Sequence, residues 1–423
     1  MLQAAHESIA LDQRAALHLQ IGCILLAELY TKTTSTEKEI NGIPNISNDA
    51  SLFDIVEHMN HGLELVNSAD ERLELAALNQ RAAAKALESG VWLASLRYSD
   101  TAIALLPENA WCEHYAICFD AHKANAESQF LLGDDDKADQ LYETLLKHTN
   151  NPLSKAEIYA ARLVQCIGNG RWQLGLELGE KGLNLLGLDM PKKGVEMAQF
   201  KAQTDDLFSS MSCDYLEETL KNLPENTDKA FQLAMYLLPN MYLVSEVLSN
   251  SENRSFFSYF AIKLTLEKGH TEFTHLVLAC FALQANMIGR NDLNKIVALA
   301  SLAYLERYPD SREQSNTYNL LAGGSFSFFS SCDEAIKLHQ LGEQVGLRNG
   351  ERGRADINCF NALFLQAAKG APLSVVYRNA QEILDSGRLQ RTFSNVPLVY
   401  SKMSEALLNG DDPHALDDDR FPK

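Results

Sequence analysis

The hydrophobic positions from about residue 70 to 409 recur with the spacing of amphipathic helices, and no stretch alternates convincingly with the period of two that marks a strand. Short polar or Gly- and Pro-containing segments separate these helical stretches, at 107–110, 133–136, 150–152, 188–194, 223–228, 308–311, 348–353 and 369–372. The pattern predicts an all-α chain of successive helices joined by short turns.

One predicted helix contains an unusual number of glycines. The stretch GRWQLGLELGEKGLNLLG, at 170–187, holds Gly175, Gly179 and Gly182 within its apolar repeat. Each glycine costs roughly 1 kcal/mol against alanine in a helix interior. Their spacing of four and three places them on one face, which predicts a neighbouring helix packed very close to this face.

The arrangement of small residues, turn glycines and aromatics resembles the tetratricopeptide repeat, a helix-turn-helix unit of about 34 residues. The stretch 121–146 shows the expected offsets at Ala126, Gly133, Ala138, Tyr142 and Leu145. The next unit shows them at Tyr159, Gly170, Trp172 and the three glycines above. Other copies are marked by Gly90 with Trp92 and Tyr98, by Gly289, by Ala335 with Gly342, and by Gly370. The predicted fold is a tetratricopeptide-like α-α superhelix, a solenoid of antiparallel helix pairs.

The chain divides by pattern into four parts. Residues 1–66 form a helical lead-in with a polar surface loop at 33–50, and 67–191 contain the clearest repeats. Residues 192–409 form divergent repeats, in which Pro239 is expected to kink or end its helix. The acidic tail 410–423 is expected to be disordered.

Charge and apolar content restrict the class of partner. The 423 residues carry a formal net charge of −19 without a cluster of Lys and Arg, which argues against nucleic acid. This excess of negative charge favours a protein or peptide ligand with basic segments. The longest apolar runs, such as 276–283, are far too short to span a bilayer, and the N-terminus lacks a secretory pattern. A cytoplasmic protein with no membrane partner is expected.

The eight cysteines are scattered, mostly in apolar segments, and form no C-x-x-C pair. They are Cys23, Cys112, Cys118, Cys166, Cys213, Cys280, Cys332 and Cys359. This pattern favours buried thiols in a reducing compartment over a zinc or redox site.

Motifs of catalysis are missing from the sequence. The Gly-Lys dipeptide of a P-loop never occurs, nor do H-R-D, D-F-G, G-x-S-x-G or H-E-x-x-H. His6-Glu7-Ser8 opens like a histidine-kinase phosphoacceptor but lacks the basic residue and the proline that should follow. We therefore expect no enzymatic activity, and no catalytic, cofactor-binding or metal-binding residues.

Three further groups of residues are candidates for chemistry, but each has a simpler interpretation. His58 and His61 lie one helical turn apart near Asp54 and Glu57, and without an identifiable third ligand they are expected to form a polar helix face.

The acidic run 134–136 lacks the spacing of a calcium loop and is expected to begin a helix. The aromatic residues Phe326, Phe328 and Phe329 are expected in the core rather than on an exposed contact surface.

The chain resembles the helical repeat region of very large bacterial signalling proteins built around a STAND-type predicted ATPase. The resemblance rests on 16–26, 51–66, 69–98, 114–142 and 170–191, and more loosely on 256–273 and its continuation to about 390. In that family a serine/threonine-kinase-like domain precedes the ATPase, and GAF and histidine-kinase modules follow the repeats. The opening of the chain resembles the end of the ATPase module, so the resemblance implies that the nucleotide-binding loops and the kinase lie outside this sequence. A remnant, a split gene product or an excised fragment is expected.

The favoured hypothesis for function is a non-enzymatic arm that binds a protein or peptide signal and relays it between the ATPase and kinase domains of a parent protein. The alternative is a stand-alone tetratricopeptide-type adaptor that holds two partners together. An enzyme with an unrecognised site is a third, weaker hypothesis, because no catalytic constellation assembles from the sequence.

Overall fold

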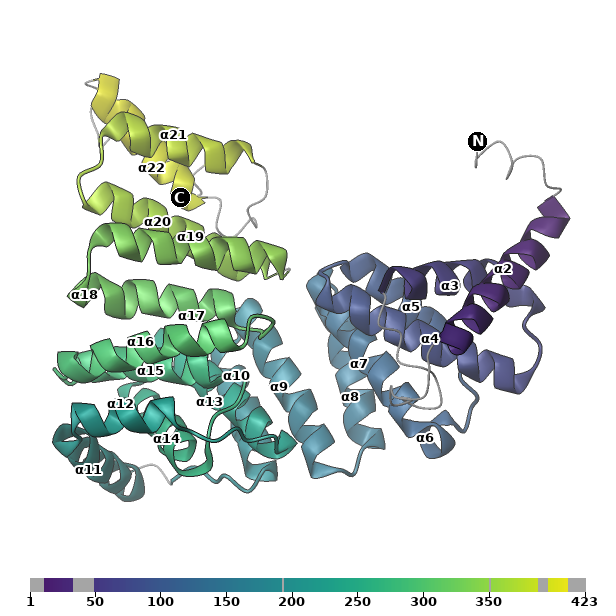
Figure 1. Ribbon diagram of the computed structural model, residues 1–423, viewed down its shortest axis with the longest axis horizontal. Helices are drawn as coiled ribbons and strands as arrows, with labels where there is room; N and C mark the ends of the chain where they lie inside the picture. Colours follow the sequence, from purple (N-terminus) through teal and green to yellow (C-terminus); the bar gives the residue numbers. More distant parts are fainter. Residues whose placement is uncertain (1–10, 33–48, 192–193, 350, 387–394, 410–423) are drawn as a thin grey trace. The chain divides into compact units, whose positions relative to one another are not determined.

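The protein is seen in a computed structural model that describes residues 11–32, 49–191, 194–349, 351–386 and 395–409 (Figure 1). Within these ranges every regular element is helical, and the β pairing is limited to an isolated bridge between Glu225 and His270. The predicted all-α fold of packed helix pairs is confirmed. The predicted tail 410–423, the loop through residue 48 and the His6-Glu7-Ser8 motif lie outside the described residues.

The chain divides into two compact units, which we call unit 1, residues 1–150, and unit 2, residues 151–423. The elements of unit 1 are α2 (Leu11–Lys32), α3 (Asp49–His61), η1 (Leu63–Leu65), α4 (Ala69–Glu88), α5 (Trp92–Leu105), α6 (Ala110–Glu113), α7 (Tyr115–Leu131) and α8 (Asp135–His148). Pairs such as α4 with α5 and α7 with α8 pack together around a core that extends from Leu26 to Ala124.

Unit 2 contains the longer stack of helices. Its elements are α9 (Pro152–Gly168), α10 (Trp172–Leu185), α11 (Val195–Ser210), α12 (Cys213–Lys221), α13 (Lys229–Val247), α14 (Ser251–Lys268), α15 (Thr274–Met287), α16 (Asn291–Arg307), α17 (Gln314–Leu321), the π-helical η2 (Ala322–Phe326), α18 (Ser327–Phe329), α19 (Cys332–Arg348), α20 (Arg352–Ala368), α21 (Leu373–Asp385) and α22 (Asn395–Asn409). One core cluster extends from Ala160 to Leu338, and a smaller one joins α20 to α21.

The turns between paired helices share one hydrogen-bonded geometry. After α7, Gly133 adopts φ 92°, its N–H donates to the carbonyl of Phe130, and the N–H of Asp134 donates to the carbonyl of Gln129. These two bonds form a Schellman motif, which favours glycine because the left-handed backbone penalises a Cβ atom. The same pair of bonds closes the turns at Gly90, Gly170, Gly187, Gly289 and Gly370. The glycines predicted to mark turns therefore do so.

The glycine face of α10 packs against α9 and α13, as its spacing predicted. A Cβ atom at Gly179 would lie 2.6 Å from the Sδ atom of Met241, and one at Gly182 would lie 3.1 Å from Leu237. At Gly175 it would lie 3.2 Å from side-chain atoms of α9. The cost in helix propensity is offset by an approach that side chains on this face would prevent.

Pro239 was expected to kink or end its helix, and the expectation that the helix ends there is wrong. The α-helix α13 runs from Lys229 to Val247 with Pro239 buried inside it. A proline inside a helix costs about 3 kcal/mol. The fully buried Leu238 and Met241 beside it gain more than this, because each large apolar side chain contributes roughly 1.5–3 kcal/mol on burial.

The cysteines differ in their exposure to solvent. Cys118, Cys166, Cys280 and Cys359 are buried, but Cys23, Cys112 and Cys332 are exposed, so the expectation of buried thiols is correct only in part. Within the described ranges, the helices are either too short or too polar to cross a membrane.

Candidate functional site: a polar network in unit 2

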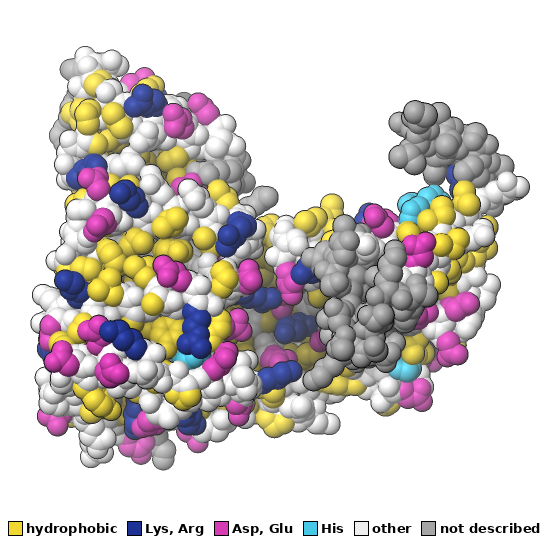
Figure 2. Space-filling view, in the orientation of Figure 1, with side chains coloured by type: hydrophobic (Ala, Val, Ile, Leu, Met, Phe, Trp, Pro, Cys, Tyr) yellow, Lys and Arg dark blue, Asp and Glu magenta, His cyan; other side chains and the backbone are white. Residues whose placement is uncertain are grey.

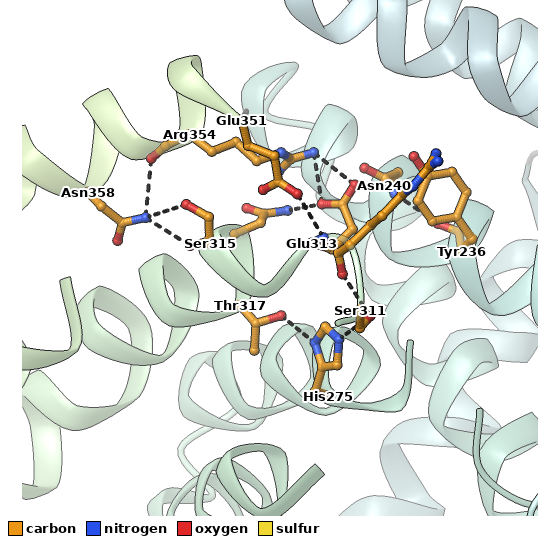
Figure 3. A network of polar contacts seen from close by, with 12 residues as sticks. Tyr236, Asn240, His275, Ser311, Glu313, Ser315, Thr317, Glu351, Arg354 and Asn358 are labelled. Atoms are coloured by element: carbon orange, nitrogen blue, oxygen red, sulfur yellow. Dashed lines mark hydrogen bonds and ion pairs between the residues drawn. The ribbon is translucent and has the colours of Figure 1, made fainter. Parts of the chain in front are cut away.

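Polar side chains from four helices of unit 2 meet around the N-terminal ends of α17 and α20 (Figure 3). The segment before α17 supplies Ser311 and Glu313, and α15 supplies His275. Most of these side chains are buried, although helix pairs of this kind normally pack through apolar residues. We define the polar network as the side chains labelled in Figure 3. Burying a polar group costs free energy unless the group is hydrogen-bonded or paired with an opposite charge.

The imidazole of His275 joins α15 to α17. Its Nδ1 lies 2.7 Å from Oγ1 of Thr317, and its Nε2 lies 2.9 Å from Oγ of Ser311. The Ser311 hydroxyl also faces the carbonyl oxygens of Glu272 and Arg312, which can only accept a hydrogen bond. Ser311 therefore donates to a carbonyl and accepts from Nε2–H, which leaves Nδ1 to accept from Thr317. These contacts select the neutral Nε2–H tautomer.

Burial keeps this imidazole uncharged. His275 is fully buried, and burial lowers its pKa to about 3. No carboxylate hydrogen-bonds to the ring in the described part of the chain, so nothing offsets the loss of hydration that a charged ring would suffer. His275 therefore acts as a neutral link between helices rather than as an acid or a base.

Asn358 of α20 makes the next link. Its amide nitrogen donates to the carbonyl oxygen of Ser315, at 2.8 Å, and to that of Arg354 in the preceding turn, at 3.2 Å. Its amide oxygen lies 2.9 Å from Nδ1 of His339 in α19. Since an amide oxygen only accepts, His339 carries its proton on Nδ1. One side chain thus joins α17, α19 and α20.

A buried ion pair lies at the outer end of the polar network. Nη2 of Arg354 lies 2.9 Å from Oε2 of Glu313, and Oε1 of Glu351 accepts a hydrogen bond of 3.3 Å from the backbone N–H of Glu313. Oε2 of Glu351 is buried without a hydrogen-bond partner among the described residues. Two carboxylates therefore face one guanidinium in a poorly hydrated place.

Helix α13 approaches the same ion pair. Tyr236 interacts electrostatically with Arg354, and Asn240 lies one turn further along α13 (Figure 3). The amide nitrogen of Asn240 donates to the carbonyl of Tyr236, whereas its buried amide oxygen has no partner among the residues described.

The side chains of the polar network can form hydrogen bonds and ion pairs. It contains hydroxyls, amides, imidazoles and carboxyls, but the hydroxyl groups beside His275 are used to hold a neutral ring. Nowhere in the described ranges are three His, Cys, Asp or Glu side chains grouped to hold a metal ion. The arrangement fits a joint between successive helix pairs.

The histidine pair singled out in the sequence has a third histidine beside it. His18 of α2 places its ring centroid 4.9 Å from that of His58 and 4.8 Å from that of His61, and the Nδ1 atoms of His18 and His58 lie 2.8 Å apart. Helix α2 therefore lies against part of the expected polar face of α3, while His61 and Asp54 stay exposed. The crossing is close, because a Cβ atom at Gly62 would lie 2.7 Å from the carbonyl oxygen of Ala15.

The other two candidate groups have mixed outcomes. Asp134 begins α8 as expected, because its carboxylate accepts the N–H of Lys137 as a helix cap. The expected core position is wrong for Phe328, which is 63% exposed, whereas Phe326 is buried. The ring of the half-buried Phe329 lies tilted against that of Phe326, with 4.8 Å between the ring centroids. The π-helical η2 before it shifts the register of the helix, so that Phe328 points outward.

Comparison with known proteins gives one partial similarity. No known protein-family model matches the sequence. Over 173 residues, 38% of this chain, the sequence is 30% identical to a protein named hybrid signal transduction histidine kinase G from Dictyostelium discoideum. The chain spans 5% of the length of that relative. Part of this chain is thus similar to a short segment of a much longer signalling kinase.

The sequence did not reveal the polar network. Its members are spread from Tyr236 to Asn358, over four helices and the segments before two of them. The available signal was the set of polar residues at positions that the apolar repeat assigns to the core, such as His275 directly before the apolar run 276–283. Polar residues at core positions identify candidates, but not which ones meet.

Proposed function

We propose that this chain is a non-enzymatic helical-repeat segment that binds a protein partner and relays this binding within a signal-transduction kinase. The similarity to the histidine kinase over 173 residues carries the proposal. The stacked helix pairs support it, because such stacks serve widely as extended binding surfaces.

The finer architecture follows from the resemblance to STAND-type ATPases with kinase modules. Nucleotide binding and phosphotransfer would belong to other domains of the parent protein, and this chain would connect them. Each helix pair contacts its neighbours, so a partner that binds one curvature of the stack better than another shifts the population of shapes. The shift would then reach the domains at either end of the stack.

An exposed apolar surface on unit 2 provides a place for such a partner. Hydrophobic side chains gather around α17 and α19 in Figure 2. Among the exposed hydrophobic residues of α16, α18 and α19 are Leu299, 48% exposed, Phe328, 63% exposed, and Leu341, 42% exposed. With a net charge of −19, the chain favours a partner that carries basic segments around its apolar contacts.

The test compares two triple variants of the full chain in crosslinking followed by mass spectrometry of its partners in cells. Leu299→Glu, Phe328→Glu and Leu341→Glu place charges on the apolar surface, whereas Ser209→Glu, Lys229→Glu and Glu252→Lys change exposed polar residues elsewhere. We expect the first variant to lose a partner that the second retains, with unchanged circular dichroism. Identical partner sets for both variants would contradict the proposed surface.

The parent protein is tested separately by reading the DNA that flanks the coding region. A P-loop encoded in frame upstream and a histidine kinase encoded downstream would support the relay. In that parent protein, the triple variant with charges on the apolar surface should change the response to the signal, while basal autophosphorylation persists. A response that survives the replacement would count against a relay. Stop codons on both sides, with the short product present in cells, would instead favour the stand-alone adaptor.

A further inference from the structure

The two carboxylates of the polar network occupy equivalent places in successive repeats. Glu313 is the N-cap residue of α17 and Glu351 is the N-cap residue of α20, and these two helices pack against each other. Arg354, in the first turn of α20, pairs with Glu313, and the backbone N–H of Glu313 donates to Glu351. The N-terminal ends of α17 and α20 are therefore joined through these three residues.

Two features of this joint are unfavourable in free energy. Glu313 has a left-handed backbone with φ 70°, a conformation that costs non-glycine residues free energy and that persists only when its surroundings hold it. Oε2 of Glu351 is buried without a hydrogen-bond partner among the described residues. Strain and an unpaired buried carboxyl in one place are typical of a switchable site rather than of a purely structural contact.

The surroundings favour a proton on Glu351. Burial, and next the negative charge of Glu313, raise the pKa of Glu351 to about 7. Arg354 and Arg312 act in the opposite direction, as does the hydrogen bond from the N–H of Glu313. Tyr236 faces the same guanidinium from α13. One carboxyl of the pair is thus poised to gain or lose a proton near neutral pH, while Glu313 keeps the ion pair with Arg354.

We propose that Glu351 is a proton-operated clasp between the N-terminal ends of α17 and α20. With the proton bound, Arg354 neutralises Glu313 alone and the two N-terminal ends stay together. When the proton leaves to solvent, two negative charges lie side by side at the guanidinium of Arg354, and the more distant charge of Arg312 offsets this only in part. Opening of the joint then hydrates the carboxylate. This inference concerns the stack itself and does not depend on the proposed partner or parent protein.

The test is hydrogen exchange of the full chain at pH 5.5 and pH 8, corrected for the intrinsic effect of pH on exchange. We expect protection of the amides in 314–321 and 352–360 to fall ~10-fold or more at the higher pH, since deprotonation favours the open joint. Glu351→Gln cannot release a proton and should show nearly equal protection at both pH values. The matched control Glu382→Gln, at an exposed position of α21, should behave as the wild type.

Two outcomes would overturn the clasp. One is a pH response in Glu351→Gln equal to that of the wild type, and the other is a wild-type protein whose α17 and α20 amides do not respond to pH. If Glu351→Gln does not fold, infrared difference spectra of the wild type decide the question. A protonated-carboxyl band that disappears between pH 6 and 8 would support the clasp, and its absence would refute it.

Discussion

A Cβ atom at Gly342 of α19 would lie 2.7 Å from three atoms of the Asn358 side-chain amide in α20. Cβ atoms essentially never come so close to other heavy atoms. Asn358 cannot move aside cheaply, because its amide is hydrogen-bonded to the carbonyl of Ser315 and to His339. The absence of a side chain at Gly342 is therefore a condition for the polar network.

Replacing Gly342 with alanine should lower the free energy of unfolding by about 2 kcal/mol or more, because overpacking and lost hydrogen bonds outweigh the gain in helix propensity. Urea unfolding of the full chain measures the change. Gly323→Ala is the matched control, since nothing lies within 4 Å of a Cβ atom there. Equal stability of the two variants would show that the contact at Gly342 is relaxed in solution.

Acidification should destabilise unit 2 through His275. Its pKa falls from 6.5 in an unfolded chain to about 3 in the fold, so the unfolded state binds the proton first. The contribution of His275 to the free energy of unfolding is fully present above pH 6.5. It is lost as the pH falls below this value, by about 1.4 kcal/mol per pH unit, which amounts to roughly 2 kcal/mol at pH 5. His275→Gln keeps a donor and an acceptor but does not titrate. We expect it to show a smaller loss than the wild type or a His114→Gln control between pH 7 and 5, in hydrogen exchange of the α15 peptides (274–287), outside the segments 314–321 and 352–360 that report on Glu351.

One turn of the stack uses serine where the other turns use glycine. Ser249, between α13 and α14, has φ 54° and the same pair of turn hydrogen bonds as the glycine turns. Ser249→Gly should raise stability by about 0.5–1 kcal/mol, since relief of the left-handed strain exceeds the entropy that glycine adds to the unfolded chain. Ser89→Gly, at φ −82°, should instead be neutral or destabilising. Thermal unfolding of both variants tests the difference in sign.

Arg290 should stabilise the attachment of α11. Its guanidinium donates to the carbonyl oxygens of Phe208, Ser209 and Met211 near the C-terminal end of α11, and also pairs with Asp292 at the start of α16. Arg290→Ala should cost roughly 2 kcal/mol, because several acceptors lose a charged donor at once. Lys221→Ala removes an exposed pair with Glu217 and should leave the stability nearly unchanged, because solvent screens such a pair. Similar losses for both would contradict this role of Arg290.

The sequence predicted the helix pairs well because their signals are local. An apolar repeat of 3.6 residues defines each helix, and glycines such as Gly133 and Gly170 define turns that only a left-handed residue closes easily. Even the close packing of α10 could be predicted, since the spacing of Gly175 and Gly179 fixes their common face. The turn at Ser249 was missed because serine gives no such signal.

The parts that could not be predicted depend on contacts between distant residues. His18 reaches His58 across 40 positions, and Asn358 reaches Ser315 across 43. Nothing in the local sequence of Pro239 shows that buried neighbours hold its helix together. Phe328 was misplaced because the π-helical segment before it changes the helical phase by an amount that an apolar pattern does not reveal.

The packing of α10 directly against α13 has a consequence for how this chain could change over evolution. The glycine face of α10 meets Leu237 and Met241 although α11 and α12 intervene in the sequence. Helices α10 and α13 are therefore neighbours in the stack, although two other helices separate them in the sequence. The helices α11 and α12 can therefore diverge while the order of the stacked pairs stays the same, as long as the buried contacts of Phe208 and Leu216 and the hydrogen bonds of Arg290 are kept or replaced together.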